Sequence, residues 1–278
     1  MYIDYYGLKE KPFNLTPDPR FLYLTPGYRE ALSQLLYGVQ ERRGFMALTG
    51  EVGTGKTTLL QALLAHLDEE TTKVAYIFNS TLPFDGLVEY MLEDLGVDRP
   101  AGTPAQRIFV LNRFLIERCR AGQNSVLIID EAQNLSPETL EQVRLLSNFE
   151  SRTDKLLQIL LVGQPELRNS LSLPQLRQLN QRISLRCTIH PLDPSECGEY
   201  VRHRLSMAGA GSRSADLFPA AALDRIARYS AGIPRMINIV CDHCLLFGYA
   251  DQRPSLDVDV VEEVIRQLDQ TEPASATG

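Results

Sequence analysis

The sequence predicts an α/β domain with a parallel sheet, followed by a small all-α domain. Short apolar runs with almost no polar alternation are separated by longer segments whose apolar residues recur every three or four positions. Such alternation of strands and helices is typical of a three-layer fold, in which helices cover both faces of a parallel sheet. After Pro191 the strand-like runs stop, and four helical patterns follow. We therefore assign residues 28–191 to the α/β part and residues 192–269 to the helical part.

Five strands are predicted in the α/β part, at Phe45–Thr49, Val74–Phe78, Val126–Ile129, Leu157–Val162 and Ile183–Ile189. The first four are expected to be covered on both faces. Helices are predicted between them, at Lys56–Leu67, Phe84–Leu95, Pro104–Arg120 and Pro137–Phe149. The C-terminal helices each open with Pro or Asp, at Pro194–Met207, Pro219–Ser230, Pro234–Tyr249 and Asp257–Asp269. A small polar linker is expected at Ala208–Ala215.

The two ends of the chain differ in character. Residues 1–27 include a stretch rich in proline and aromatic residues, which is expected to pack as an ordered strap rather than form a regular element. Residues 270–278 are a short Pro/Ala/Ser/Thr stretch, expected to be a linker or a frayed end.

Composition excludes several classes of protein. The chain has 278 residues, 44% of them hydrophobic and 23% charged, which is ordinary for a globular protein and excludes disordered or collagen-like chains. A net charge of −7 gives no global basic field that would attract nucleic acid or acidic lipid. No apolar run is long enough to span a membrane, and the start of the chain does not resemble a secretory signal. With an odd number of cysteines, five, the sequence predicts a cytoplasmic protein with free thiols.

A phosphate-binding loop is predicted between the first strand and the helix that follows it. Gly50-Glu51-Val52-Gly53-Thr54-Gly55-Lys56-Thr57 fits the pattern G-x-x-x-x-G-K-[ST] at every specified position. Glycines let successive backbone N–H groups curl around a polyphosphate, and the N-terminus of the helix adds positive potential. Lys56 is expected to contact the β- and γ-phosphates, Thr57 to ligate Mg²⁺, and Thr58 to complete the nucleotide-binding segment.

A second candidate site, which is acidic, lies about 75 residues downstream of the phosphate loop. There the apolar strand Val126–Ile129 is followed by Asp130 and Glu131. Taken alone, this pattern is a common strand end. Together with the phosphate loop it predicts that Asp130 holds the magnesium shell and that Glu131 orients and deprotonates a water molecule. Because a P-loop kinase needs no hydrolytic glutamate here, the pair favours hydrolysis of a nucleoside triphosphate.

A string of further motifs resembles one family over residues 1 to about 268. They are Tyr5–Phe13, Thr16–Leu24, Glu30–Leu32, Leu36–Gly38, the phosphate loop, Asp130–Leu135 and Gly163–Leu167. On these residues the chain resembles the AAA+ ATPases, and among them the ExeA-type proteins, also called general secretion pathway protein A. Exosortase-associated and pilus-biogenesis ATPases share most of the motifs. The resemblance implies a P-loop NTPase core of the AAA+ type with a helical lid, and ATP and Mg²⁺ as its ligands.

The resemblance also implies roles for three further residues. Gln164 stands at the sensor-1 position, where it would touch the γ-phosphate or the water; the alternative is a glutamine that caps the turn before Pro165. Arg235, in Gly232-Ile233-Pro234-Arg235, stands at the sensor-2 position. A cation at the start of a helix opposes the helix dipole, which makes more sense if it meets a phosphate.

Arg182 stands where the family places its arginine finger, which acts on the nucleotide of a neighbouring subunit. Arg177 and Arg186 are rivals, and the alternative is that these arginines form a basic rim. The family also implies that aromatic residues of the strap, among them Phe13 and Phe21, cover the adenine; the alternative is that they pack the domain.

The favoured function is therefore an Mg²⁺-dependent ATPase that oligomerises and powers or regulates assembly of a bacterial cell-envelope secretion system. The resemblance implies an inner-membrane protein partner and action at the inner face of the inner membrane. It also raises the expectation of a membrane span and a periplasmic domain after Gly278. The alternative is an ATP-dependent DNA-binding regulator of the transposition or origin-binding type, which only the arginines between Arg168 and Arg186 favour.

Overall fold

The computed structural model describes residues 1–78, 82–97, 102–150, 154–211 and 214–271. The chain divides into two compact units. The sheet unit consists of Pro26–Glu51 and Leu59–Ile189, and the helical unit consists of Met1–Thr25, Val52–Thr58 and His190–Gly278.

The sheet unit contains five parallel strands in the order β2-β3-β4-β1-β5. They are β1 (Phe45–Gly50), β2 (Thr72–Ile77), β3 (Asn124–Ile129), β4 (Gln158–Gly163) and β5 (Ile183–Ile189). The predicted parallel sheet is confirmed, and the five predicted strands are the five observed ones. Strand β1 lies between β4 and β5, and β4 separates it from β3.

Strands β1, β3 and β4 occupy the interior of the sheet and are buried at every residue. Strand β2 lies at the edge: Ala75 and Ile77 are buried, but the other four residues are partly or fully exposed. The prediction that β2 would be covered on both faces is therefore wrong. An edge strand has a neighbouring strand on one side only, so part of it faces solvent. This holds even when its sequence lacks the alternation of polar and apolar residues.

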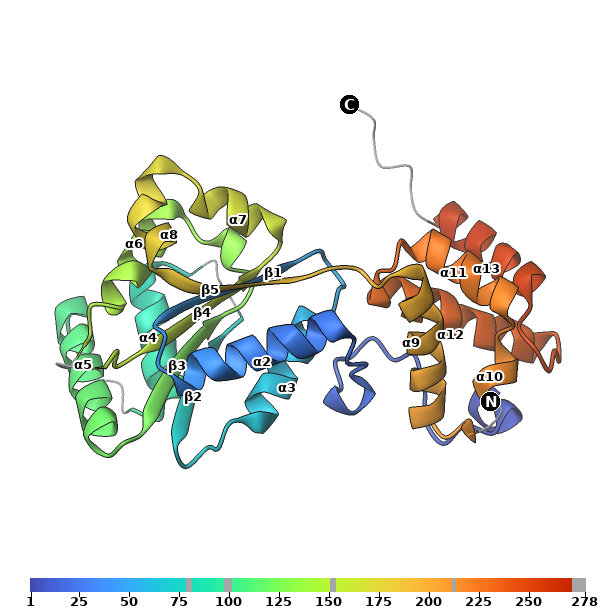
Figure 1. Cartoon of the computed structure of the whole chain (residues 1–278), viewed down its shortest axis with the longest axis horizontal. Coiled ribbons are helices and arrows are strands. Elements are labelled where there is room, and N and C mark those ends of the chain that lie inside the picture. Colours follow the sequence, from blue (N-terminus) through green and yellow to red (C-terminus); the bar gives the residue numbers. More distant parts are fainter. Residues whose placement is uncertain (79–81, 98–101, 151–153, 212–213, 272–278) are drawn as a thin grey trace. The chain divides into compact units, whose positions relative to one another are not determined.

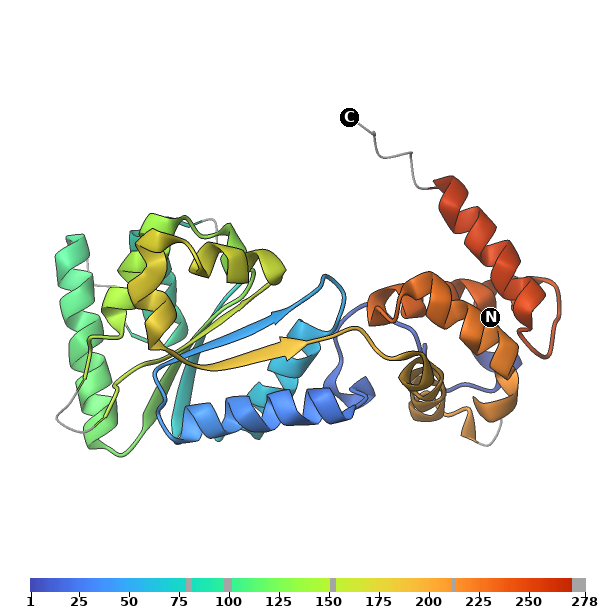
Figure 2. The ribbon, with the colours of Figure 1, turned by 45° about the horizontal axis from the view of Figure 1, so that its top comes forward.

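Helices cover both faces of the sheet (Figures 1 and 2). One face carries α2 (Pro26–Gln40) and α3 (Lys56–His66); the other carries α4 (Phe84–Asp94), α5 (Pro104–Arg120), α6 (Pro137–Leu146), α7 (Pro165–Leu171) and α8 (Arg177–Arg182). Helix α2 packs tightly on β1, since a Cβ atom at Gly38 would lie 2.3 Å from Sδ of Met46. The sequence did not predict α2, because its first residue, Pro26, belongs to the Pro-rich stretch; a proline is compatible with the first turn of a helix.

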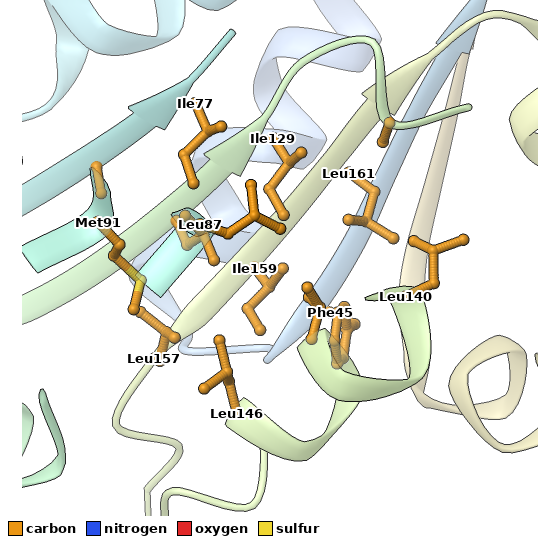
Figure 3. Close-up of a cluster of buried hydrophobic side chains, with 14 of the residues drawn as sticks. Phe45, Ile77, Leu87, Met91, Ile129, Leu140, Leu146, Leu157, Ile159 and Leu161 are labelled. Atoms are coloured by element: carbon orange, nitrogen blue, oxygen red, sulfur yellow. The ribbon is translucent and has the colours of Figure 1, made fainter. Parts of the chain in front are cut away.

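One hydrophobic core of the sheet unit lies between the sheet and helices α4 to α8 (Figure 3). Side chains that alternate along the interior strands, such as Ile129, Ile159 and Leu161, point into it. Leu87 and Met91 from α4 and Leu140 from α6 meet them there. This packing holds the interior strands in register, so the residues that follow their carboxyl ends have fixed positions.

The helical unit contains α9 (Pro194–Met207), α10 (Ser214–Leu217), α11 (Ala220–Ser230), α12 (Pro234–Ala250) and α13 (Val258–Thr271), together with α1 (Tyr2–Tyr6). The short helix α10 begins inside the segment predicted as a linker. Residues 270 and 271 end α13, and the rest of the predicted tail lies outside the described residues.

The N-terminal strap is fixed to this unit by the buried side chain of Arg204 on α9. Its guanidinium donates to the carbonyl oxygens of Pro12 at 2.6 Å and Asn14 at 3.2 Å, and to the hydroxyl of Tyr200 at 2.9 Å. It also lies 4.9 Å from the centre of the Phe21 ring. The strap therefore packs as an ordered segment on the helical unit.

In the described part of the chain, no helix combines the length and the apolar character needed to cross a bilayer.

Candidate functional site

The candidate site is assembled at the carboxyl edge of the parallel sheet. In the register of the sheet, Thr49 of β1 pairs with Gly163 of β4, and Ile129 of β3 pairs with Leu161. The chain leaves these strands into the phosphate loop, into Asp130 and Glu131, and into Gln164. Parallel strands deliver their carboxyl ends to one edge, where ligands of such sheets bind. The fold thus brings the strand-borne site residues to one place.

The phosphate loop follows β1 directly. Gly50 is the last residue of β1, Glu51 and Val52 are exposed, Thr54 is buried, and Lys56, Thr57 and Thr58 form the first turn of α3. Gly53 and Gly55 have φ angles of 79° and 95°, a region that side chains disfavour. This geometry turns backbone N–H groups at the start of a helix, which suits the binding of phosphate. Lys56 is 7% exposed.

Arg235 lies next to this loop, within the helical unit. Its backbone N–H donates to the carbonyl oxygen of Gly53 at 3.2 Å. A Cβ atom at Gly53 would lie 2.7 Å from Cβ of Arg235, so Gly53 also provides room for the start of α12. The exposed Arg235 side chain follows Pro234, the first residue of α12. The structure therefore brings the predicted sensor-2 residue to the phosphate loop.

Asp130 is 7% exposed and has both carboxylate oxygens bonded. Oδ2 accepts from the hydroxyl of Tyr76 at 2.7 Å, and Oδ1 accepts from the backbone N–H of Glu131 at 2.9 Å. Burial, followed by the bond to Asp130, raises the pKa of Tyr76 well above its ordinary value, so Tyr76 remains a donor. These two donors hold the Asp130 carboxylate in one orientation.

Glu131, Gln133 and Gln164 form a connected group. Oε2 of Glu131 accepts from Nε2 of Gln133 at 2.5 Å and from Nε2 of Gln164 at 3.1 Å. Oε1 of Gln133 in turn accepts from the backbone N–H of Gln164 at 3.1 Å. Glu131 has a φ angle of 51°, the left-handed conformation that non-glycine residues adopt rarely and that is frequent at functional sites. The predicted base and the predicted sensor-1 residue are thus in direct contact.

The three candidate finger residues occupy different surroundings. Arg182, at the end of α8, donates to Oγ of Ser147 and to Oδ1 of Asn148, both at 2.7 Å. Arg186, on β5, donates to Asn180, and burial lowers the pKa of its guanidinium. Arg177 is exposed at the start of α8. Arg182 and Arg186 therefore have partners within this chain.

The donor groups fit a magnesium ion that is shared with a nucleotide. Among the described residues, no group of three or more His, Cys, Asp and Glu side chains could hold a metal by itself. Mg²⁺ is usually held by one or two carboxylates together with substrate phosphates, and does not need such a cluster. The Asp130 carboxylate at the end of β3 and the Thr57 hydroxyl at the start of α3 are oxygen ligands of the kind that Mg²⁺ prefers.

The sequence did not single out Gln133 or Tyr76. Gln133 stands in the run after Glu131, but only the turn at Glu131 directs its side chain to Gln164. Tyr76 reaches Asp130 because β2 and β3 are neighbours, with Ile77 paired to Ile129. A polar residue within four positions of a predicted strand end is the signal that would have found both. Phe13 and Phe21 are buried in the helical unit, as the packing alternative for the strap expects.

Comparison with known proteins defines the class. Residues 39–171 match the family model described as AAA domain. The structure resembles the ORC2 protein of Aeropyrum pernix in its ADPNP–ADP complexes, with a TM-score of 0.72 at 18% identity over 97% of this chain and 74% of that one. It also resembles Cdc6p of Pyrobaculum aerophilum, with a TM-score of 0.71 at 19% identity over 92% and 70%. The chain therefore contains an AAA domain and has the AAA+ fold, and an AAA domain implies nucleotide binding.

The chain is also similar in sequence to a known protein. The chain is 44% identical over 253 residues to general secretion pathway protein A of Aeromonas hydrophila, a match that covers 90% of this chain and 45% of the relative. The expected similarity to ExeA-type proteins is thus confirmed. The chain spans less than half the length of that relative.

Proposed function

We propose that the chain is an Mg²⁺-dependent ATPase that oligomerises and powers or regulates assembly of a bacterial cell-envelope secretion system. The observation that carries the ATPase part is the contact of 3.1 Å between the Glu131 carboxylate and the Gln164 amide at the carboxyl edge of the sheet. It gathers a proton acceptor and a polar donor at the edge from which the phosphate loop departs. Such an arrangement suits attack of water on a phosphoryl group.

In the proposed reaction, Glu131 accepts a proton from water while the water oxygen attacks the γ-phosphorus. The bond from the γ-phosphorus to the bridging oxygen breaks, and ADP departs with the bonding electrons. The N–H groups of the phosphate loop and Lys56 would bind the phosphates, while Thr57 and Asp130 would hold Mg²⁺, which would offset the negative charge of the phosphates. Gln164 orients the water or the γ-phosphate.

Two arginines have proposed roles in addition to those of the residues above. Arg235 lies beside the phosphate loop, where a cation would stabilise the negative charge of the transferring phosphoryl group. Arg182 is proposed as the finger that a neighbouring subunit supplies, which requires a homo-oligomer. Within this chain its guanidinium donates to the Ser147 hydroxyl and the Asn148 amide oxygen at the end of α8.

The secretion role rests on the similarity to general secretion pathway protein A. We propose an inner-membrane protein as the partner and the cytoplasmic face of the inner membrane as the location. We also propose that the ATPase consists of a core domain over residues 28–191 and a lid domain over residues 192–269. Deletion of the gene should lower type II secretion, and the wild-type gene should restore it while a Lys56→Ala copy should not. Restoration by the Lys56→Ala copy would contradict a role for ATP.

The ATPase itself is tested with purified chain, ATP and Mg²⁺. Lys56→Ala should abolish binding of a fluorescent ATP analogue, because the loop loses its cation. Glu131→Gln should bind ATP with unchanged affinity but reduce hydrolysis by at least about 100-fold, since it removes the proton acceptor. Full turnover by Glu131→Gln would refute the role of Glu131 as base.

The DNA-binding alternative rests on the arginines between Arg168 and Arg186, of which Arg168 donates to Thr188, Arg182 to Ser147 and Arg186 to Asn180, while Arg177 is exposed. A gel-shift titration with duplex DNA and ATP at about 50–200 mM salt tests it directly. Tight, steeply salt-dependent binding would favour the alternative.

A further inference from the structure

The side chain of Gln133 connects the ends of two neighbouring strands. It follows β3 by four positions and lies in the single 3₁₀ turn η2 (Ala132–Asn134). Its Nε2 donates to Oε2 of Glu131, and its Oε1 accepts from the backbone N–H of Gln164, which directly follows β4. One amide group thus fixes both a side chain at the end of β3 and the backbone at the end of β4.

The backbone around Gln133 is built to hold this position. The left-handed Glu131 starts the turn, its carbonyl oxygen accepts from the N–H of Asn134 at 3.0 Å, and Ala132 is fully buried beneath the turn. With these constraints the Gln133 side chain is directed across the edge of the sheet to β4. A left-handed non-glycine residue costs of the order of 1–3 kcal/mol, so the surrounding structure must maintain it.

Gly163, the last residue of β4, provides the space that Gln133 occupies. A Cβ atom there would lie 2.5 Å from Oε1 of Gln133 and 3.0 Å from Cδ2 of Leu167. Gly163 is not among the residues with positive φ, so its backbone conformation does not require glycine. The close approach of the Gln133 amide gives a physical reason for glycine at this position.

We propose that Gln133 is a positioning residue for hydrolysis, which aligns Glu131 with Gln164. The proposal rests on the proposed ATPase function and assigns to that site a residue that neither binds the phosphates nor accepts the proton. Without Gln133, the Glu131 carboxylate loses one of its amide donors, and the Gln164 backbone loses its side-chain acceptor. Misplacement of reacting groups by about 1 Å can lower a rate by about 100-fold.

The kinetic test compares Gln133→Ala with the wild-type chain under saturating Mg²⁺ and ATP. Gln133→Ala should lower kcat by about 10–100-fold and leave KM and the affinity for a fluorescent ATP analogue within about 2-fold, because the phosphate loop is untouched. Gln123→Ala is the matched control: its side chain binds the carbonyl oxygen of Glu70, away from the site, and kcat should not change. A wild-type kcat for Gln133→Ala would overturn the proposal.

Gly163→Ala tests the same relationship without removal of a functional group. Its methyl group should displace the Gln133 amide and lower kcat to a similar extent. If both substitutions act through Gln133, the double variant should be no slower than Gln133→Ala alone, because the displaced side chain is already absent. Multiplicative losses in the double variant would contradict a shared cause.

A third readout needs no activity, so it distinguishes failure of this inference from failure of the proposed ATPase. Hydrogen exchange of the Gln164 backbone N–H, measured by NMR on nucleotide-free chain, should be faster in both Gln133→Ala and Gly163→Ala. The N–H of Leu167, which donates to the Gln164 carbonyl at 2.9 Å, serves as internal control and should exchange at its wild-type rate. Unchanged exchange at Gln164 would refute the positioning role even if the wild-type chain hydrolyses ATP. Faster exchange in a chain that lacks ATPase activity would instead refute the proposed function alone.

Discussion

The hydroxyl of Tyr76 donates a hydrogen bond of 2.7 Å to Oδ2 of Asp130, which joins the ends of the neighbouring strands β2 and β3. Asp130 is 7% exposed, so hydrogen-bond donors from the protein take the place of most of the water around its carboxylate. Tyr76→Phe should lower the free energy of unfolding by about 1–3 kcal/mol, the usual effect of removing a donor from a buried charged group. Urea unfolding at pH 7 measures this. Tyr37→Phe is the control: Tyr37 is 46% exposed and its hydroxyl accepts from the exposed Arg43, so stability should change by less than about 0.5 kcal/mol.

The same tyrosine predicts a loss of stability at alkaline pH. Burial and the bond to Asp130 raise the pKa of Tyr76 above 10.0, whereas in the unfolded chain the phenol ionises near that value. Above pH 10 the unfolded chain therefore releases a proton that the folded chain retains, and the free energy of unfolding falls. In Tyr76→Phe this contribution is absent, so unfolding free energies measured from pH 9 to 11 should fall less steeply. An equal slope in both proteins would show that Tyr76 does not contribute.

Two glycines with the same backbone conformation should respond differently to substitution. Gly232 and Gly96 both have a φ angle of 74°, but a Cβ atom at Gly232 would lie 2.1 Å from the carbonyl oxygen of Leu192, whereas at Gly96 nothing lies within 4 Å. Gly96→Ala should cost about 1–2 kcal/mol, the strain of a left-handed alanine. Gly232→Ala should cost at least about 2 kcal/mol more, because it also pushes Leu192 from the start of α12. Equal losses in thermal unfolding would contradict the steric reason.

Arg204 should determine whether the strap stays attached to the helical unit. Arg204→Lys cannot reproduce bonds to Pro12, Asn14 and Tyr200 together, because an ammonium group lacks the planar fork of the guanidinium. We expect a loss of about 2–4 kcal/mol in the free energy of unfolding and faster tryptic cleavage in the strap. Arg202→Lys, an exposed substitution on the same helix, is the matched control. Cleavage of the strap at the wild-type rate would refute the role of Arg204.

The finger assignment can be tested by mixing two inactive variants. If Arg182 acts on the nucleotide of a neighbouring subunit, mixtures of Arg182→Ala and Glu131→Gln should regain part of the ATPase activity, because some interfaces then combine an intact Arg182 with an intact Glu131. Arg177→Ala and Arg186→Ala, each mixed with Glu131→Gln, test the rivals in the same way. Activity in the Arg182 mixture that equals the sum of the separate variants would count against Arg182.

Contiguous features of this protein could be predicted from its sequence. The phosphate loop is a single run of residues, and the interior strands are short apolar runs with a clear period, so both were predicted with nearly their observed bounds. Helix α5 was predicted from its opening proline and its apolar spacing, at Pro104–Arg120 as observed. The positions of Asp130, Glu131 and Gln164 at one edge followed from the parallel order of the strands.

Features that depend on side-chain direction could not be predicted. Arg204 lies among polar neighbours in a helix pattern that indicates an exposed residue, yet it is 7% exposed because the strap folds back over it. The contact of Gln133 with Gln164 depends on the unusual backbone of Glu131, which no residue preference foretells. The extent of burial of β2 depends on strand order, which periodicity does not report.

The two amide bonds to Oε2 of Glu131 have a directional consequence. A carboxylate oxygen has two lone pairs, and Oε2 already accepts from both Gln133 and Gln164. Two donors on one oxygen restrict rotation of the carboxylate about the Cγ–Cδ bond. The two glutamines would therefore fix the plane of the Glu131 carboxylate before a substrate binds.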